Sequence, residues 1–318
     1  MIDPDEDEPF ATTTRPFVKP IALYRGARVR LIAPSGVFDR ALFEKGAARL
    51  AQRYDVAFDP GIFTQAGYLA GSDARRREEL LAALDDPHCQ AIVCARGGYG
   101  ALRIVPSVPV AALARAPKLL VGFSDVTALH VAWQRARVTS VHGAMAATLG
   151  KLDDLPFERW VRCMEGAPLP PIEELETITP GEAKGVMVGG NLSILCALEG
   201  TPYSAHAMNR IVFLEDTGEA PYRVDRMLTS LRLAGFFDGA RGVVLGAFTQ
   251  SSAAPYGTTV EDVLRERLAD LEIPVIRGVP AGHVEDNLEI PLGVEVTISA
   301  TATGASLRFE ESPVRLAD

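Results

Sequence analysis

The chain has 318 residues, 47% of them hydrophobic and 23% charged, which suits one large domain or two domains of ordinary size. Its net charge of -9 argues against nucleic-acid binding through phosphate contacts and favours a small-molecule or peptide partner. No apolar run reaches the ~18 residues of a membrane-spanning helix, and the N-terminus lacks the basic and apolar parts of a secretory signal. We therefore expect a cytoplasmic protein with no membrane partner and with reduced cysteines.

The N-terminal half is predicted to be a tail followed by a regular alternation of strands and helices. Residues 1–25 are polar and acidic, without apolar periodicity, and are expected to form a flexible tail. Expected strands cover residues 28–34, 56–58, 90–95, 118–123 and 138–141, and expected helices cover residues 39–53, 72–84 and 126–135. This alternation predicts that residues 26–165 form a parallel, doubly wound sheet, which binds ligands at the carboxyl ends of its strands.

The C-terminal half is less regular. Residues 166–185 are rich in Pro, Glu and Gly and are predicted to be a linker, so that residues 186–318 form a second domain of mixed α/β structure. Expected strands there cover residues 211–214, 242–247, 275–276, 294–299 and 305–309, with helices after Asn191 and over residues 222–234. The last two strands alternate apolar and polar residues, which is typical of an antiparallel pair.

Ser124 stands where an apolar strand meets a helix, in the sequence Val-Gly-Phe-Ser-Asp-Val-Thr. A serine at such a turn projects its hydroxyl from the sheet edge. The N–H of the next residue, Asp125, lies at a helix N-terminus, where it can face a developing oxyanion. This arrangement favours a nucleophile, although the segment is not GxSxG. The alternative is that Ser124 only caps the helix, which on this feature alone is the more frequent role.

A second loop, Arg96-Gly97-Gly98-Tyr99-Gly100, also follows a buried strand. Adjacent glycines permit unusual backbone angles and a close approach of the backbone to a ligand, so the N–H of Gly98 is a candidate second oxyanion donor. The loop matches neither the dinucleotide-binding nor the P-loop motif, and no cofactor is predicted. A plain tight turn fits the loop equally well.

Glu215 closes an apolar strand, where its carboxylate could orient a histidine and stabilise the imidazolium that forms during catalysis. Asp216 and Glu219 compete for this role, and any of the three could be a solvated surface carboxylate. His283 lies in a Gly/Pro loop just after a strand and is the preferred histidine. His142 follows another strand and could line the pocket or form a hydrogen bond in the core. No metal-ligand spacing occurs, so no metal site is expected.

Ser124, Glu215 and His283 would supply a nucleophile, an orienting acid and a base, each at or just beyond a strand end. Around them the sequence resembles the serine LD-carboxypeptidases, a family that includes muramoyltetrapeptide carboxypeptidase and the microcin C immunity peptidase. The resemblance covers nearly the whole chain from Arg28. It rests on the blocks Ile-Ala-Pro-Ser35, Ala-Arg-Gly-Gly-Tyr-Gly100, Gly-Phe-Ser-Asp-Val-Thr-Ala-Leu-His130, Gly-Gly-Asn-Leu-Ser193, Leu-Glu-Asp-Thr-Gly-Glu219, Pro-Tyr-Arg-Val-Asp-Arg226, Gly-His283, Asn287 and Pro-Leu-Gly293.

The resemblance implies that Ser124 is the nucleophile, His283 the general base and Glu215 its orienting acid, with an oxyanion hole made by the amides of Gly98 and Asp125. It implies a flavodoxin-like N-terminal domain, a smaller β-rich C-terminal domain, an active site at their junction, and a homodimer. The implied activity is removal of the terminal D-amino acid, typically D-Ala, from murein tetrapeptide in peptidoglycan recycling, through an acyl-enzyme.

The part of the site that binds the substrate is less defined by the sequence. Arg96 is a candidate to hold the terminal carboxylate of the peptide, with Gly97 and Tyr99 beside it. One alternative activity is hydrolysis of a microcin C-like aminoacyl nucleotide, which would call for an aromatic platform; neither Trp133 nor Trp160 is an obvious one. Another alternative is a two-domain binding protein without catalysis.

Overall fold

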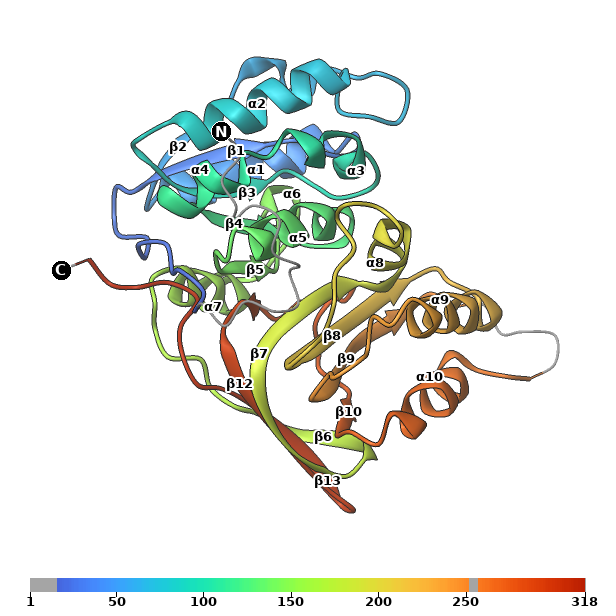
Figure 1. Cartoon of the computed structure of the whole chain (residues 1–318). Coiled ribbons are helices and arrows are strands. Elements are labelled where there is room, and N and C mark those ends of the chain that lie inside the picture. The colour runs from blue at the N-terminus through green and yellow to red at the C-terminus, as the bar shows by residue number, and fades with distance from the viewer. Residues whose placement is uncertain (1–15, 252–256, 318) are drawn as a thin grey trace, which may run out of the picture.

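The computed structural model describes residues 16–251 and 257–317 of the chain. The described residues form an open six-stranded sheet covered by helices and a closed β-barrel beside it (Figure 1). The strand order of the open sheet is β11-β5-β4-β3-β1-β2. Its strands are β1 (Arg28–Ile32), β2 (Asp55–Ala57), β3 (Cys89–Cys94), β4 (Leu119–Gly122), β5 (Ser140–His142) and β11 (Ile290–Leu292). All neighbouring strands run parallel except β11, which pairs antiparallel with β5.

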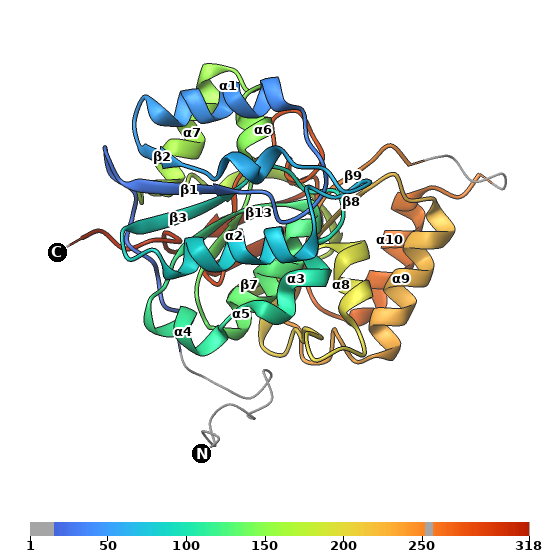
Figure 2. The same ribbon diagram turned by 90° about the horizontal axis from the view of Figure 1, so that it is seen from above.

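Helices cover both faces of this sheet (Figure 2). Its central strands are apolar along nearly their whole length, so both faces must be kept from water. One face is covered by α1 (Arg40–Ala51), α6 (Ala146–Leu149) and α7 (Asp154–Met164), and the other by α2 (Asp73–Asp85), α3 (Ala101–Ile104), α4 (Val110–Arg115) and α5 (Thr127–Arg135). Successive residues of a strand alternate between the two cores: Val93 packs on the side of α1, and Ile92 on the side of α2. The predicted doubly wound sheet is therefore confirmed.

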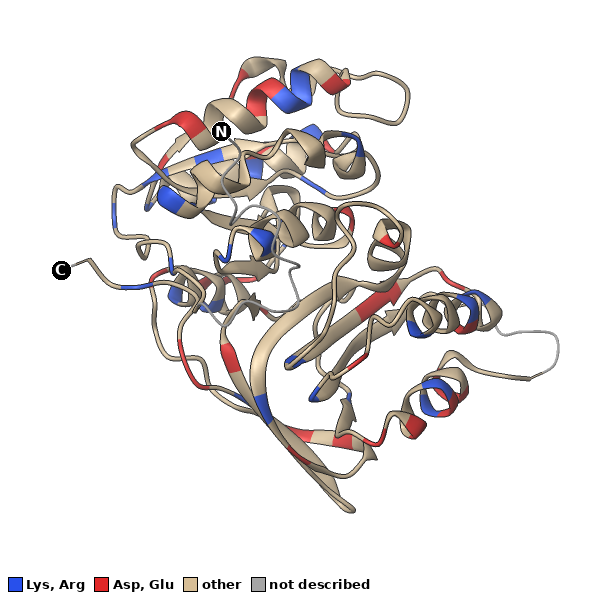
Figure 3. Ribbon diagram, in the orientation of Figure 1, with Lys and Arg blue, Asp and Glu red and all other residues tan. Residues whose placement is uncertain are grey.

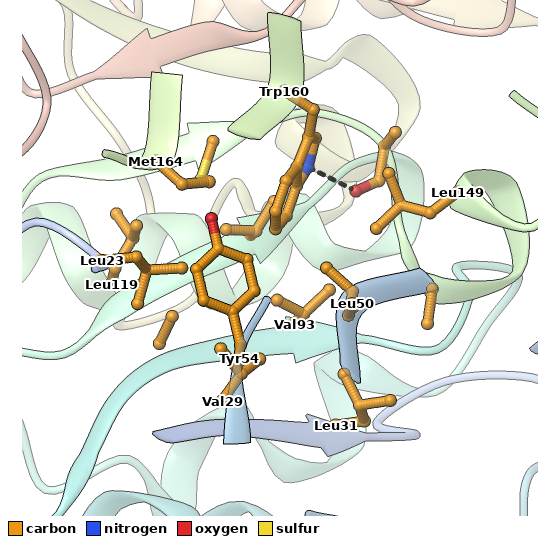
Figure 4. Packing of buried hydrophobic residues seen from close by; sticks show 14 of the residues in the cluster. Leu23, Val29, Leu31, Leu50, Tyr54, Val93, Leu119, Leu149, Trp160 and Met164 are labelled. Atoms are coloured by element: carbon orange, nitrogen blue, oxygen red, sulfur yellow. Dashed lines mark hydrogen bonds between the residues drawn. The ribbon is translucent and has the colours of Figure 1, made fainter. Parts of the chain in front are cut away.

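Figure 4 shows the core beneath α7, where Trp160 lies over Tyr54, Leu50 and Val93. The indole of Trp160 is fully buried, and its Nε1–H donates to the carbonyl of Ala144 at 3.1 Å, so burial leaves no indole donor unpaired. This core anchors the segment before α6 to the sheet, close to the carboxyl end of β5.

The barrel has the strand order β10-β6-β13-β12-β7-β8-β9. Its strands are β6 (Ile172–Thr179), β7 (Gly181–Asn191), β8 (Arg210–Thr217), β9 (Gly242–Thr249), β10 (Val275–Arg277), β12 (Glu295–Thr301) and β13 (Gly304–Phe309), and helices α8 (Leu192–Leu198), α9 (Pro221–Leu233) and α10 (Val260–Leu268) pack outside it. Along β8, Ile211 and Phe213 face the barrel interior, while Val212 and Leu214 face the helices. The expected antiparallel pair near the C-terminus is formed by β12 and β13. This barrel is the predicted smaller, β-rich part.

The structure differs from the prediction over residues 166–185, which were expected to be a linker. This stretch contains β6 and the first part of β7, both integral strands of the barrel. Only Leu175 is buried in β6, and the strand contains three glutamates. It therefore has no regular apolar pattern that would predict a strand. Its register is irregular against both neighbours, and Glu174 has a positive φ of 58°. A polar, irregular strand looks like a linker in the sequence because its hydrogen bonds leave no mark on composition.

Part of the predicted flexible tail is also structured. Residues 1–15 lie outside the described residues, but residues 16–25 are partly buried and are hydrogen-bonded to the folded part of the chain. The N–H of Val18 donates to the backbone carbonyl of Arg137 at 2.7 Å, and the N–H of Leu23 donates to that of Met164 at 2.9 Å. Leu23 is 3% exposed. Short apolar stretches such as this one are held by the folded core and have no periodicity of their own.

Candidate active site

Ser124 sits on a strained turn at the carboxyl end of β4. It begins the one-turn helix η4 (Ser124–Val126), and its φ of 63° lies in the left-handed region that L-residues avoid. Holding an L-residue there costs about 1–2 kcal/mol. Its hydroxyl makes no hydrogen bond with any described residue, and neither η4 nor α5 has a side-chain cap. The structure therefore does not support the helix-cap alternative, and the hydroxyl is left available for another partner.

The glycine loop lies directly against this turn. A Cβ on Gly97 would lie 3.0 Å from Cβ of Ser124 and 3.2 Å from its Oγ, and Gly98 has a φ of +107°. Only glycine permits the close approach at residue 97 and the positive φ at residue 98 without strain. Within the described part of the chain, the N–H groups of Gly98 and Asp125 donate to no backbone carbonyl. One of these two amides thus belongs to the residue after Ser124, and the other to the residue after Gly97, the glycine that lies against Ser124.

The side chain of Asp125 points away from the site into the protein. Its carboxylate is buried and accepts a hydrogen bond from the N–H of Ala101 at 2.8 Å. Burial raises the pKa of Asp125, although the hydrogen bonds that its oxygens accept act in the opposite direction. The carboxylate joins the start of α3 to η4, and it thereby fixes the turn that carries Ser124 relative to the glycine loop.

Glu215 and His283 form a hydrogen-bonded pair. Glu215 lies on β8 and is fully buried, and its Oε2 is 2.8 Å from Nδ1 of His283, whose side chain is 22% exposed. An ionised carboxylate can only accept, so Nδ1 carries the proton and Nε2 is left free to act as a base. The acids of β8 follow the apolar run of residues 211–214, near the carboxyl end of the strand (Figure 3).

A second imidazole lies beside Glu215. Nε2 of His142 is 3.5 Å from Oε1 of Glu215, and the same oxygen accepts a hydrogen bond from Nδ2 of Asn191 at 3.1 Å. Burial by itself would raise the pKa of Glu215, but His142 and His283 outweigh it and hold the pKa at about 2. Glu215 is consequently an anion at every pH at which the protein is expected to work.

The two acids that competed with Glu215 in the sequence point elsewhere. Asp216 accepts from the N–H of Ser193 at 2.9 Å and from that of Thr217 at 2.8 Å, and it does not contact His283. Burial, assisted by the charge of Glu215, raises its pKa to about 6. Glu219 lies 3.6 Å from Arg223 near the start of α9. Among these three acids, only Glu215 meets the histidine.

Ser124 and His283 come from different parts of the fold and meet through Phe123. The ring of Phe123 packs edge-on against His283 with 5.0 Å between centroids. The described residues show no hydrogen bond between Ser124 and His283. The structure thus packs His283 against the residue that precedes Ser124, while the hydroxyl and the imidazole are not hydrogen-bonded, as occurs in enzymes without bound substrate.

The remaining predicted residues, Arg96 and Tyr99, are exposed residues of the glycine loop. Arg96 is exposed, and its Nη1 donates to the carbonyl of Val37 at 2.8 Å. Tyr99 is 45% exposed and packs edge-on against Tyr68, with 5.7 Å between ring centroids. Arg96 also lines a pocket of about 930 Å³ that continues to Val284, the residue after His283.

The sequence did not assign a role to Asn191 or decide one for His142. Asn191 caps α8 by accepting from the N–H of Ile194 at 3.3 Å, while its amide Nδ2 donates to both Glu215 and Asp216. The glycines that precede it in Gly-Gly-Asn were the available signal, because they allow a close approach to α5. His142 carried no signal beyond its place after a strand.

The described residues offer neither a metal-binding cluster nor a membrane-spanning helix. No cluster of three or more His, Cys, Asp or Glu side chains there could hold a metal ion. No helix there is long and apolar enough to cross a membrane. Cysteines 89, 94, 163 and 196 are all free thiols.

Comparison with known proteins identifies the family. The profile of the LD-carboxypeptidase N-terminal domain matches residues 29–143, and that of the LD-carboxypeptidase C-terminal domain matches residues 184–298. The murein tetrapeptide carboxypeptidase of Pseudomonas aeruginosa is 32% identical over 281 residues, which cover 84% of this chain and 91% of that protein. The chain belongs to the LD-carboxypeptidase family.

Solved structures agree with this assignment. Muramoyltetrapeptide carboxypeptidase from Oxalobacter formigenes is 28% identical, with a TM-score of 0.80 over 90% of this chain and 100% of the other. The microcin C7 self-immunity protein MccF matches with a TM-score of 0.83 over 94% of this chain and 100% of the other, at 21% identity, which shows a common fold. This LD-carboxypeptidase family member is therefore a peptidase, of a family whose members are serine-type.

Proposed function

We propose that this peptidase is a serine LD-carboxypeptidase that removes the terminal D-amino acid, typically D-Ala, from murein tetrapeptide in cytoplasmic peptidoglycan recycling. The observation that carries the proposal is the hydrogen bond of 2.8 Å between the buried Glu215 and His283, together with the strained turn of Ser124. The relative that acts on murein tetrapeptide, at 32% identity, supports the choice of substrate.

In the proposed reaction, Nε2 of His283 takes the proton of the Ser124 hydroxyl while Oγ attacks the carbonyl carbon before the terminal D-residue. Glu215 holds the imidazole through Nδ1 and stabilises the positive charge that it gains. The unpaired amides of Gly98 and Asp125 would donate to the oxyanion. The protonated His283 then gives its proton to the leaving amine, and a water activated by the same imidazole hydrolyses the ester on Ser124.

Substrate orientation is proposed to depend on the glycine loop. Arg96 would hold the terminal carboxylate, since it is the exposed cation nearest to Gly97 in the chain and its guanidinium has donors beyond the one bound to Val37. Gly97 lets the peptide backbone approach Ser124, and Tyr99 offers an exposed ring at the rim. We also propose a homodimer, which sedimentation of the pure protein would test.

Mass spectrometry of murein tetrapeptide incubated with the pure protein tests the proposal. The expected product is the tripeptide together with D-Ala, and Ser124→Ala should abolish it while leaving the circular dichroism spectrum unchanged. Undiminished turnover by Ser124→Ala would remove this residue as nucleophile. Release of no amino acid by the parent protein, with peptide binding retained, would instead indicate a binding protein.

A microcin-like aminoacyl nucleotide should be included in the same experiment as the rival substrate. Trp133 and Trp160 are both fully buried, so neither can stack on a nucleobase. Cleavage of the nucleotide analogue but not of the tetrapeptide would favour the microcin-type activity.

A further inference from the structure

The pocket beside the predicted catalytic residues is larger than a terminal D-alanine needs. Its volume of about 930 Å³ is in the range that accommodates a whole drug-sized ligand. One wall is Arg96, adjacent to the glycine that touches Ser124, and another is Val284, adjacent to His283. The pocket is thus lined by chain neighbours of Gly97 and His283, which puts it next to the residues proposed to act on the scissile bond.

The charged groups on the pocket wall include both signs, and some already have partners. Asp39 accepts the N–H of Leu42 at 2.9 Å as the cap of α1, and Asp286 pairs with Arg159 at 2.6 Å. Lys151, Asp153 and Glu285 are all exposed. Among the described residues, none of these three side chains has a hydrogen bond or an ion pair.

The pocket also has an apolar wall, which favours a ligand with an aliphatic part. Phe38, Leu42 and Leu152 also line the pocket and provide a surface for methylene groups. A ligand group that contacts the apolar residues and pairs with both signs of charge has an aliphatic stem and ends in an ammonium and a carboxylate. A neutral or purely cationic side chain would leave Lys151 without an anion.

We propose that this pocket binds the zwitterionic end of the third residue of the substrate peptide, with its ammonium against Glu285 and its carboxylate against Lys151. Asp153, which is two residues from Lys151 in the chain, adds to the negative potential that favours the ammonium. This inference rests on the proposed function and applies to a murein tetrapeptide whose third residue is diaminopimelate, an amino acid whose side chain ends in such a group.

The test compares three L,D-tetrapeptides that differ only in the third residue: diaminopimelate (ammonium and carboxylate), lysine (ammonium only) and norleucine (neutral). For each, kcat and KM are measured with the full chain and with the variants Glu285→Gln and Lys151→Gln. Glu78→Gln and Lys45→Gln are matched controls, because both residues are exposed helical positions that do not line the pocket.

Lys151→Gln should lower kcat/KM about tenfold for the diaminopimelate peptide alone, chiefly through KM, since one charge-assisted hydrogen bond is lost. Glu285→Gln should lower it about tenfold for the diaminopimelate and lysine peptides, while the norleucine peptide is unaffected. Equal effects on all three peptides, or no effect on any, would overturn the pocket assignment while leaving the proposed activity intact.

Failure of the proposed function itself is recognised separately. If the parent protein cleaves none of the peptides, calorimetric binding of the same three peptides to Ser124→Ala still tests the pocket. Tighter binding of the diaminopimelate peptide that both Glu285→Gln and Lys151→Gln weaken would support the subsite. Equal binding of all three peptides would reject it.

Discussion

Gly282 lies so close to Glu215 that no side chain fits between them. A Cβ on Gly282 would lie 2.5 Å from Oε2 of Glu215, the oxygen that holds His283, and 3.0 Å from Cβ of Glu215. Gly282 also has a φ of +114°. The close approach lets the loop that follows Gly282 bring His283 down onto a fully buried carboxylate.

Gly282→Ala is therefore expected to displace either the loop or the carboxylate. The free energy of unfolding should fall by about 2–3 kcal/mol from overpacking and backbone strain together, and kcat should fall at least tenfold. Urea denaturation and peptide kinetics measure the two effects. Gly278→Ala is the matched control: its φ is +94°, but the nearest atom to an added Cβ is Cδ2 of Leu175 at 3.9 Å. Equal losses of kcat in both variants would contradict the steric explanation.

The left-handed backbone of Ser124 predicts a difference between two inactive variants. Alanine retains the strain of a φ of 63°, whereas glycine relieves it. Part of the gain is lost because glycine is more flexible in the unfolded chain. We expect Ser124→Gly to be more stable than Ser124→Ala by up to about 1 kcal/mol in denaturant unfolding. A glycine variant that is the less stable of the two would show that the turn stores no strain.

The low pKa of Glu215 predicts a loss of stability in acid. Because its pKa in the folded protein is about 2, below the ordinary value of 4.5, the carboxylate stabilises the fold above pH 4.5 and this contribution disappears as the pH falls towards 2. Between pH 5 and pH 3 the protein should lose about 2 kcal/mol more than Glu215→Gln, measured by urea unfolding at each pH. Parallel pH curves for the two proteins would refute the shift.

His142→Phe separates the contribution of the second imidazole from that of His283. Phenylalanine preserves the edge-on packing of this ring against Phe213 but removes Nε2 from the side of Glu215. The pKa of Glu215 should rise towards its ordinary value, so the acid-induced loss between pH 5 and pH 3 should be smaller than in the parent. An unchanged pH curve would mean that His142 only fills space.

Arg159 on α7 forms ion pairs with residues that follow His283 in its loop. It binds Asp286 at 2.6 Å and the buried Glu289 at 3.0 Å. Arg159→Met should lower the free energy of unfolding by about 3 kcal/mol, because an unpaired carboxylate stays buried. Burial raises the pKa of Glu289, so the loss should be greater at pH 8 than at pH 5. Adding Glu289→Gln should restore part of the stability; no recovery would place the effect in Asp286 instead.

Much of the fold follows from local patterns in the sequence. The expected helix over residues 39–53 is α1, and the expected strand over residues 90–95 is β3, each shifted by a few residues at most. These elements are apolar in a period that burial requires, so their type is visible locally. β6 was missed because nearly all of its residues are polar or exposed. Its existence depends on β10 and β13, which pair with it from elsewhere in the chain.

The site shows the same division. The positions of Ser124 and His283 after strands could be predicted from the sequence, since strand ends and glycine turns are local features; Glu215 was expected to close its strand, but β8 continues to Thr217. That Glu215 rather than Asp216 contacts His283 depends on the fold, because neighbouring residues of a strand point to opposite faces. The fold alone also brings His142, which lies on β5 and is distant from Glu215 in the sequence, beside the same carboxylate. Such contacts depend on how distant strands pack, which no local pattern records.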